Sequence, residues 1–143
     1  MSWKKANAYL NSAKYQEIVK DIETLKIFSS NVDIFIFAAG IGFSNNICEP
    51  IEKGQNGTEI KTSSTDALKN NLQYIQAIAL AKKQDVTILD DWDECVVICS
   101  EFVNGGLSML EDLRNEYPQD STYIDQLVQL MRRQAIKNIK NKK

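Results

Sequence analysis

The chain has 143 residues, of which 43% are hydrophobic and 25% charged, so it can form one soluble domain with its own core. It contains no histidine, which excludes Ser-His-Asp and Cys-His catalysis and histidine-ligated zinc, and removes the usual acid–base group at neutral pH. No apolar run is long enough to span a membrane, and the three cysteines follow no disulfide framework, so we expect a cytoplasmic protein.

The net charge of −2 conceals two segments of opposite sign. Residues 85–116 carry nine acidic side chains against Arg114 alone. Residues 122–143 carry six basic side chains against Asp125 alone. A small protein with two oppositely charged segments favours charged macromolecular partners over a neutral small molecule.

The first part of the chain predicts two helices. Residues 3–28 carry apolar side chains at three- and four-residue spacing, and the Ser-Ser-Asn run at 29–31 ends this helix and can cap the next. Residues 32–43 form an apolar run that fits a buried strand or a buried helix by periodicity alone. The cap and the Ala38–Ala39 pair favour a central helix that ends near Gly42.

Residues 44–65 form the long irregular stretch of the chain. An Asn-Gly turn signal lies there between two short segments, 50–52 and 58–61, which allows a small β-hairpin. A loop of this length is often a functional element. A third helix is predicted over 66–83, followed by a single helical turn at 86–89.

Residues 92–113 predict a long helix with one continuous apolar stripe. The stripe has spacings of three and four residues and consists of Cys95, Cys99, Phe102, Gly106, Met109 and Leu113. Within it lies Asn104-Gly105-Gly106, where each glycine costs roughly 0.5–1 kcal/mol relative to alanine. Because the stripe continues, we interpret Phe102, Asn104, Gly105 and Gly106 as a close helix crossing rather than a break. The neighbour is either the helix around Ala38–Ala39 or a partner subunit.

A last helix is predicted from the capping Asp120-Ser121 pair, followed by a flexible basic tail at 137–143. The fold is therefore expected to be all-α, with about five helices in a single domain over residues 1–136. Six basic side chains could contact nucleic-acid phosphates without reading base sequence: Arg132, Arg133, Lys137, Lys140, Lys142 and Lys143. A solubilising tail is the alternative interpretation.

Three other patterns do not amount to a catalytic or cofactor site. The Gly40-Ile41-Gly42 run lacks the third glycine of a dinucleotide fingerprint, and no βαβ unit follows it. The acids at 90–94 lack EF-hand spacing and fit the positive end of a helix dipole. Cys95 and Cys99 have acidic neighbours, which disfavour a thiolate. We therefore predict no catalytic residue, no cofactor and no metal ligand.

Three stretches carry a resemblance to a known family. Residues 33–46 read D-I-F-I-F-A-A-G-I-G-F-S-N-N, residues 78–90 read I-A-L-A-K-K-Q-D-V-T-I-L-D, and residues 101–110 read E-F-V-N-G-G-L-S-M-L. In order, they are similar to the FAA-x-x-G-F-x-N, I-A-L…L-x-D and E-[YF]-A-N-G-G-L segments of the DNA phosphorothioation (Dnd) system-associated protein 4 family. The resemblance covers residues 14–131. Val103 stands where the family usually has alanine, the loop after the first motif differs, and the basic tail lies outside.

The resemblance implies a bacterial protein from gene clusters that mark DNA with sulfur and restrict unmarked DNA, and it implies no enzyme activity. We expect a non-catalytic accessory or scaffolding subunit of an anti-phage defence system. Its expected partners are other proteins of a defence complex and the DNA backbone, with no membrane; a homo-oligomer is compatible with the sequence. The alternative function is a sequence-independent nucleic-acid-binding module that uses the basic C-terminal helix and tail.

Overall fold

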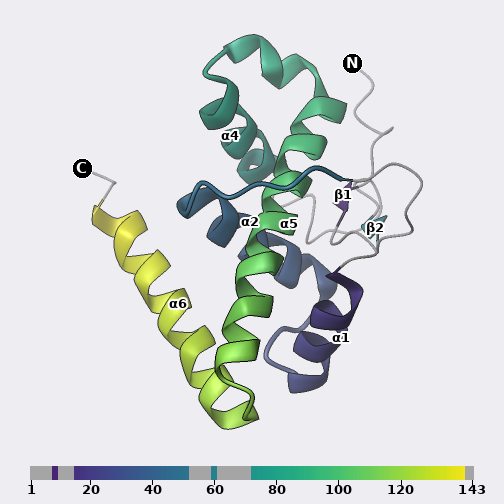
Figure 1. Cartoon of the computed structure of the whole chain (residues 1–143). Coiled ribbons are helices and arrows are strands. Elements are labelled where there is room, and N and C mark those ends of the chain that lie inside the picture. Colours follow the sequence, from purple (N-terminus) through teal and green to yellow (C-terminus); the bar gives the residue numbers. More distant parts are fainter. Residues whose placement is uncertain (1–7, 10–14, 52–58, 61–71, 141–143) are drawn as a thin grey trace.

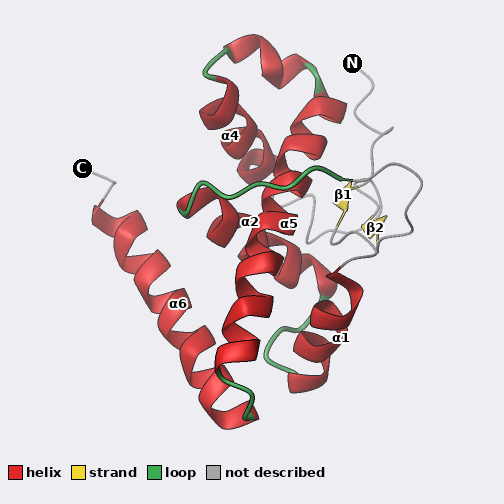
Figure 2. Ribbon diagram, in the orientation of Figure 1, coloured by secondary structure: helices red, strands yellow, loops and turns green. Residues whose placement is uncertain are grey.

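The computed structural model describes residues 8–9, 15–51, 59–60 and 72–140, and in this part of the chain α-helices dominate (Figures 1 and 2). This confirms the all-α class. In chain order the elements are β1 (Ala8–Tyr9), α1 (Gln16–Leu25), α2 (Asn31–Ser44), β2 (Glu59–Ile60), α4 (Leu72–Lys83), the short 3-10 helix η2 (Val86–Asp90), α5 (Trp92–Glu116) and α6 (Asp120–Lys140). None of the described helices has both the length and the apolarity that a membrane span needs.

Helix α5 is the central element of the molecule. The helices α1, α2, α4 and α6, the 3-10 helix η2 and the strand β1 all contact it (Figure 1). Residues 98–107 are buried along its middle, except for the half-buried Glu101. Three residues of the predicted stripe, Cys95, Cys99 and Phe102, are part of the hydrophobic core. A helix enclosed to this extent needs small residues wherever another backbone comes close.

Helix α2 resolves the ambiguity of the apolar run at residues 32–43. The Ser30 side chain accepts a hydrogen bond from the Asp33 amide at 3.3 Å, and Ser29 donates to the Asp33 carboxylate at 2.6 Å. The first contact gives a free amide of the first turn its hydrogen-bond acceptor. The second holds the negative charge of Asp33 at the positive end of the helix dipole. Buried residues lie on nearly every side of α2, including Phe35, Ala38 and Ile41. That explains why the sequence shows no clear helical periodicity there.

The N-terminal prediction of one helix over residues 3–28 is wrong in its extent. Helix α1 begins only at Gln16, and Lys26 ends it with a left-handed φ of 57°. Before it, β1 pairs antiparallel with β2, with Ala8 opposite Ile60. A local pattern cannot reveal a pairing partner so far along the chain.

The hairpin that the sequence allows around residues 50–61 lies partly outside the described residues. In the described part, Glu59–Ile60 pairs with Ala8–Tyr9. Of the third predicted helix, α4 is described from Leu72 to Lys83, and the predicted single turn is observed as η2.

Arg114, in the last turn of α5, joins three helices. Its guanidinium pairs with Asp21 of α1 at 3.0 Å and with Asp120 of α6 at 2.6 Å, and it lies over the Tyr123 ring at 4.7 Å from the centroid. The Tyr123 hydroxyl also donates to the Leu110 carbonyl at 3.4 Å. These contacts fix the start of α6 against α5. The backbone of α6 then continues to Lys140, so residues 137–140 of the predicted tail are helical.

Candidate functional site

The predicted crossing residues lie where α2 and α5 make backbone contact. A Cβ added to Gly106 would lie 1.9 Å from the Ala38 carbonyl oxygen, and a Cβ added to Gly42 would lie 2.1 Å from the Phe102 carbonyl oxygen. In each helix, therefore, a glycine lies against a backbone carbonyl of the other helix. The two helices are antiparallel here, because Ala38 lies beside Gly106 whereas Gly42, later in α2, lies beside Phe102, earlier in α5. The close neighbour of Gly106 is therefore a helix of the same chain.

Gly105 serves a second contact that the sequence did not suggest. A Cβ there would lie 1.9 Å from the Ile47 carbonyl oxygen and 3.1 Å from the Cys48 amide nitrogen. The segment after α2 therefore crosses α5 at this glycine. The Glu49 amide donates to the Glu101 carbonyl at 3.0 Å, and the Tyr15 hydroxyl donates to the Glu49 carboxylate. The Asn-Gly-Gly run thus accommodates backbone on two sides of α5.

Phe102 and Asn104 complete the crossing. Phe102 is buried, with its ring edge-to-face against Phe43 at a centroid distance of 5.5 Å and with the Lys82 ammonium 5.9 Å from its ring centroid. Asn104 is also buried, two residues from Gly106 and so on another side of the helix. Phe43 is the exposed member of this group, with 39% of its surface accessible. The four predicted residues are therefore part of the packed interior.

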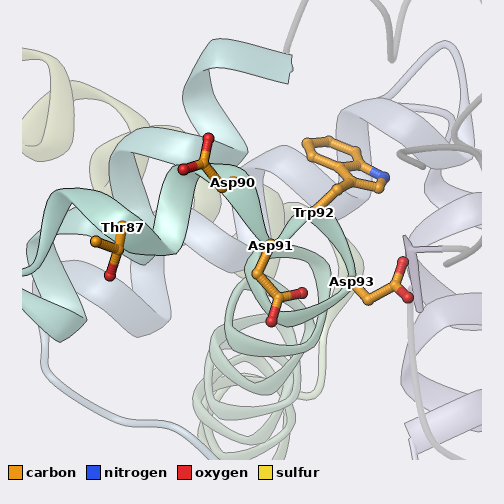
Figure 3. A pocket seen from close by; sticks show the side chains of 5 residues that line it. All are labelled: Thr87, Asp90, Asp91, Trp92 and Asp93. Atoms are coloured by element: carbon orange, nitrogen blue, oxygen red, sulfur yellow. The ribbon is translucent and has the colours of Figure 1, made fainter. Parts of the chain in front are cut away.

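An acidic pocket of about 330 Å³ lies at the start of α5, lined by Thr87, Asp90, Asp91, Trp92 and Asp93 (Figure 3). Asp91 caps α5 by accepting a hydrogen bond from the Glu94 amide at 3.1 Å. Trp92 is buried, whereas Asp90 and Asp93 are exposed. The positive end of the α5 dipole stabilises this group of carboxylates.

The neighbouring Asp85 organises η2. Its carboxylate accepts hydrogen bonds from the Thr87 amide at 3.0 Å and the Thr87 hydroxyl at 2.8 Å. These bonds, the backbone one first, hold the pKa of Asp85 below its ordinary value. The Asp85 carboxylate therefore stays ionised at neutral pH.

The geometry of the acidic pocket indicates its chemical capability. Figure 3 shows the carboxylates of Asp90, Asp91 and Asp93 pointing in different directions rather than at one point. Within the described ranges, no three histidine, cysteine or carboxylate side chains come together as a metal-binding group. The pocket instead presents negative charge on the protein surface, where a cationic side chain can pair with it.

The two cysteines of α5 are poor nucleophiles. Burial raises the pKa of Cys99, and burial together with Asp91 and Glu94 raises the pKa of Cys95. The Cys95 thiol also donates to the Ile88 carbonyl at 3.2 Å. Both groups are therefore protonated thiols at neutral pH, while Cys48 is exposed.

The predicted basic residues are only partly described. Arg132 and Arg133 are exposed on α6, and the Arg133 guanidinium donates to the Gln129 carbonyl at 3.5 Å. Lys137 and Lys140 follow on the same helix, whereas Lys142 and Lys143 lie outside the described residues. Neither arginine lines the acidic pocket, and neither is among the nearest neighbours of the crossing glycines.

Comparison with known proteins supports the resemblance that the sequence motifs carry. A family model described as DNA sulphur modification system-associated protein 4 matches residues 11–143. The match confirms the resemblance and extends it through the basic tail. No match was found among curated proteins or among solved structures.

Proposed function

We propose that this chain, which belongs to the DNA sulphur modification system-associated protein 4 family, is a non-catalytic accessory subunit of a prokaryotic anti-phage defence system. In this role it holds other proteins of a DNA phosphorothioation-linked restriction-modification complex through protein–protein contacts. The observation that carries the proposal is the family match over residues 11–143.

The chemistry of the chain supports a role without catalysis. There is no histidine in the sequence, and the two thiols of α5 have raised pKa values. The carboxylates of the acidic pocket diverge (Figure 3). None of these groups forms a nucleophile paired with a base, which is the arrangement that acyl or phosphoryl transfer requires.

The acidic pocket is the surface that best fits a protein partner. Asp90 and Asp93 are exposed on either side of the buried Trp92. Because Trp92 is packed in the core, it holds in place the backbone that carries the two charges. A basic segment of a partner can pair with both carboxylates. Charges at the rim of an interface mainly steer association and select the partner.

The experiment is co-expression of the tagged chain with each of the other DNA sulphur modification proteins of the same organism. We expect at least one of them to co-purify, and we expect Asp90→Lys with Asp93→Lys to weaken that complex about tenfold, since both charges then repel a basic segment. The matched control is Glu17→Lys with Glu23→Lys, which reverses two exposed charges of α1, one of them in its first turn.

The outcomes separate the parts of the proposal. If none of the system proteins binds the wild-type chain, the accessory role is wrong. If the acidic and control variants bind equally well, the accessory role stands and the contact surface lies elsewhere.

A second candidate function is sequence-independent binding of nucleic acid, favoured by the exposed Arg132 and Arg133 on α6. If the basic segment binds phosphates, affinity for random duplex falls steeply as the salt concentration rises, because cations released from DNA drive binding. Deleting residues 137–143 should then abolish binding in a mobility-shift or anisotropy titration. Unchanged affinity after this deletion would exclude the tail from binding.

A further inference from the structure

Helix α6 carries a second apolar stripe beside the face that packs on the body. Tyr123 and Leu127 are buried, and Leu130 packs against the core. The second stripe consists of Ile124, Val128 and Met131. These side chains are half-buried, and they are not part of the hydrophobic cluster formed by the described residues. Their spacing of four and three residues places them on one side of the helix.

The far half of α6 leaves the body of the molecule. Figure 1 shows α6 meeting α5 at its N-terminal end and diverging from it toward the C-terminus. The contacts of Tyr123 with Leu110 and Arg114 hold the near end. The second stripe, from Ile124 to Met131, therefore lies along the half of α6 that packs on the body, beside Leu127 and Leu130.

Two opposite charges flank this stripe on the same side. Asp125 and Arg132 are both exposed and seven residues apart, so they repeat nearly the same position on α6 two turns apart, about 10 Å along the axis. The spacing is too long for a pair within the helix. Acidic Asp120 and Asp125 belong to the first half of α6, whereas Arg132 and Arg133 belong to the second.

We propose that the occupant of this stripe is α6 of a second copy of the chain, packed antiparallel about a two-fold axis. In that arrangement Ile124, Val128 and Met131 of the two copies cover one another. Asp125 of each copy then lies beside Arg132 of the other, so the same ion pair forms twice. Such a self-complementary contact is the kind that a two-fold dimer requires.

The charge pattern favours a second copy over nucleic acid. DNA would use the cations alone, would be repelled by Asp125 and would leave the apolar stripe in water. A second copy uses both charges and buries the stripe. This inference does not depend on the accessory role, since it concerns only how the chain associates with itself.

The test is the mass of the full chain by sedimentation velocity over a concentration series at low salt. We expect a monomer–dimer equilibrium. Asp125→Arg alone and Arg132→Asp alone should each weaken the dimer about tenfold or more, since each change makes two attractive pairs repulsive. The double exchange of Asp125→Arg and Arg132→Asp should restore dimerisation, because the opposite charges face one another again.

Two controls keep the result specific. Val128→Asp should abolish the dimer by burying a carboxylate at the centre of the contact, and circular dichroism should show that the monomer keeps its helices. Glu17→Arg on α1 should leave the dimer unchanged. A monomer at every concentration, or a double exchange as weak as the single variants, would overturn the proposal. An Arg132→Asp variant that loses DNA binding but still dimerises would assign Arg132 to nucleic acid instead.

Discussion

Gly106→Ala is expected to lower the free energy of unfolding by about 3 kcal/mol or more, the largest effect of any single methyl group that we propose to add. The new Cβ would lie 1.9 Å from the Ala38 carbonyl oxygen and 2.7 Å from its carbonyl carbon. Both atoms belong to the backbone of α2, so no side chain can rotate away. The two central helices must separate, and Gly106→Leu should therefore be more severe still. Urea unfolding followed by circular dichroism measures the loss.

The control for this prediction is Ser108→Ala, two residues further along α5 and only half-buried. We expect it to change stability by less than about 0.5 kcal/mol. Gly42→Ala tests the same crossing from the other helix, since its Cβ would lie 2.1 Å from the Phe102 carbonyl oxygen. The double variant should cost less than the sum of the single ones, because the first change already separates the helices. A Gly106→Ala variant that unfolds at the same urea concentration as the wild type would refute the backbone contact.

Gly105→Ala should have a different result, with a smaller loss of about 1–3 kcal/mol and a local change in the segment after α2. Its Cβ would lie 1.9 Å from the Ile47 carbonyl oxygen, but Ile47 belongs to a loop that can move away. The movement would break the 3.0 Å bond from the Glu49 amide to the Glu101 carbonyl. Hydrogen exchange measured by mass spectrometry should show faster exchange of peptides that contain Glu49.

The contrast between the two glycines is itself a check. In Gly105→Ala the peptides of α2 should remain protected, whereas in Gly106→Ala they should lose protection together with those of α5. If the α2 peptides lose as much protection in Gly105→Ala as in Gly106→Ala, the segment after α2 unfolds together with the α2–α5 pair and not independently of it. If it leaves the Glu49 peptides unchanged, the loop does not depend on this glycine.

The sequence by itself determined the elements whose signals are local. The apolar stripe from Cys95 to Leu113 predicted α5, because residues three and four apart share a helix face. The capping run at residues 29–31 and the Ala38–Ala39 pair favoured a helix for the apolar run that became α2, although the periodicity alone did not decide. The three motifs at residues 33–46, 78–90 and 101–110 pointed to the family that the comparison then matched.

Only the tertiary structure decided which distant segments meet. Because Ala8–Tyr9 pairs with Glu59–Ile60, the first helix is shorter than predicted. Gly105 contacts the backbone of Ile47, whereas Gly106 contacts that of Ala38. Gly106 stood out in the sequence because a glycine in a helix is costly, but which backbone it admits depends on how α2 lies against α5. The spacing of apolar residues along the chain shows which side chains share a face of one helix or strand. Contacts between elements depend on chain closure over long separations, which no local pattern records.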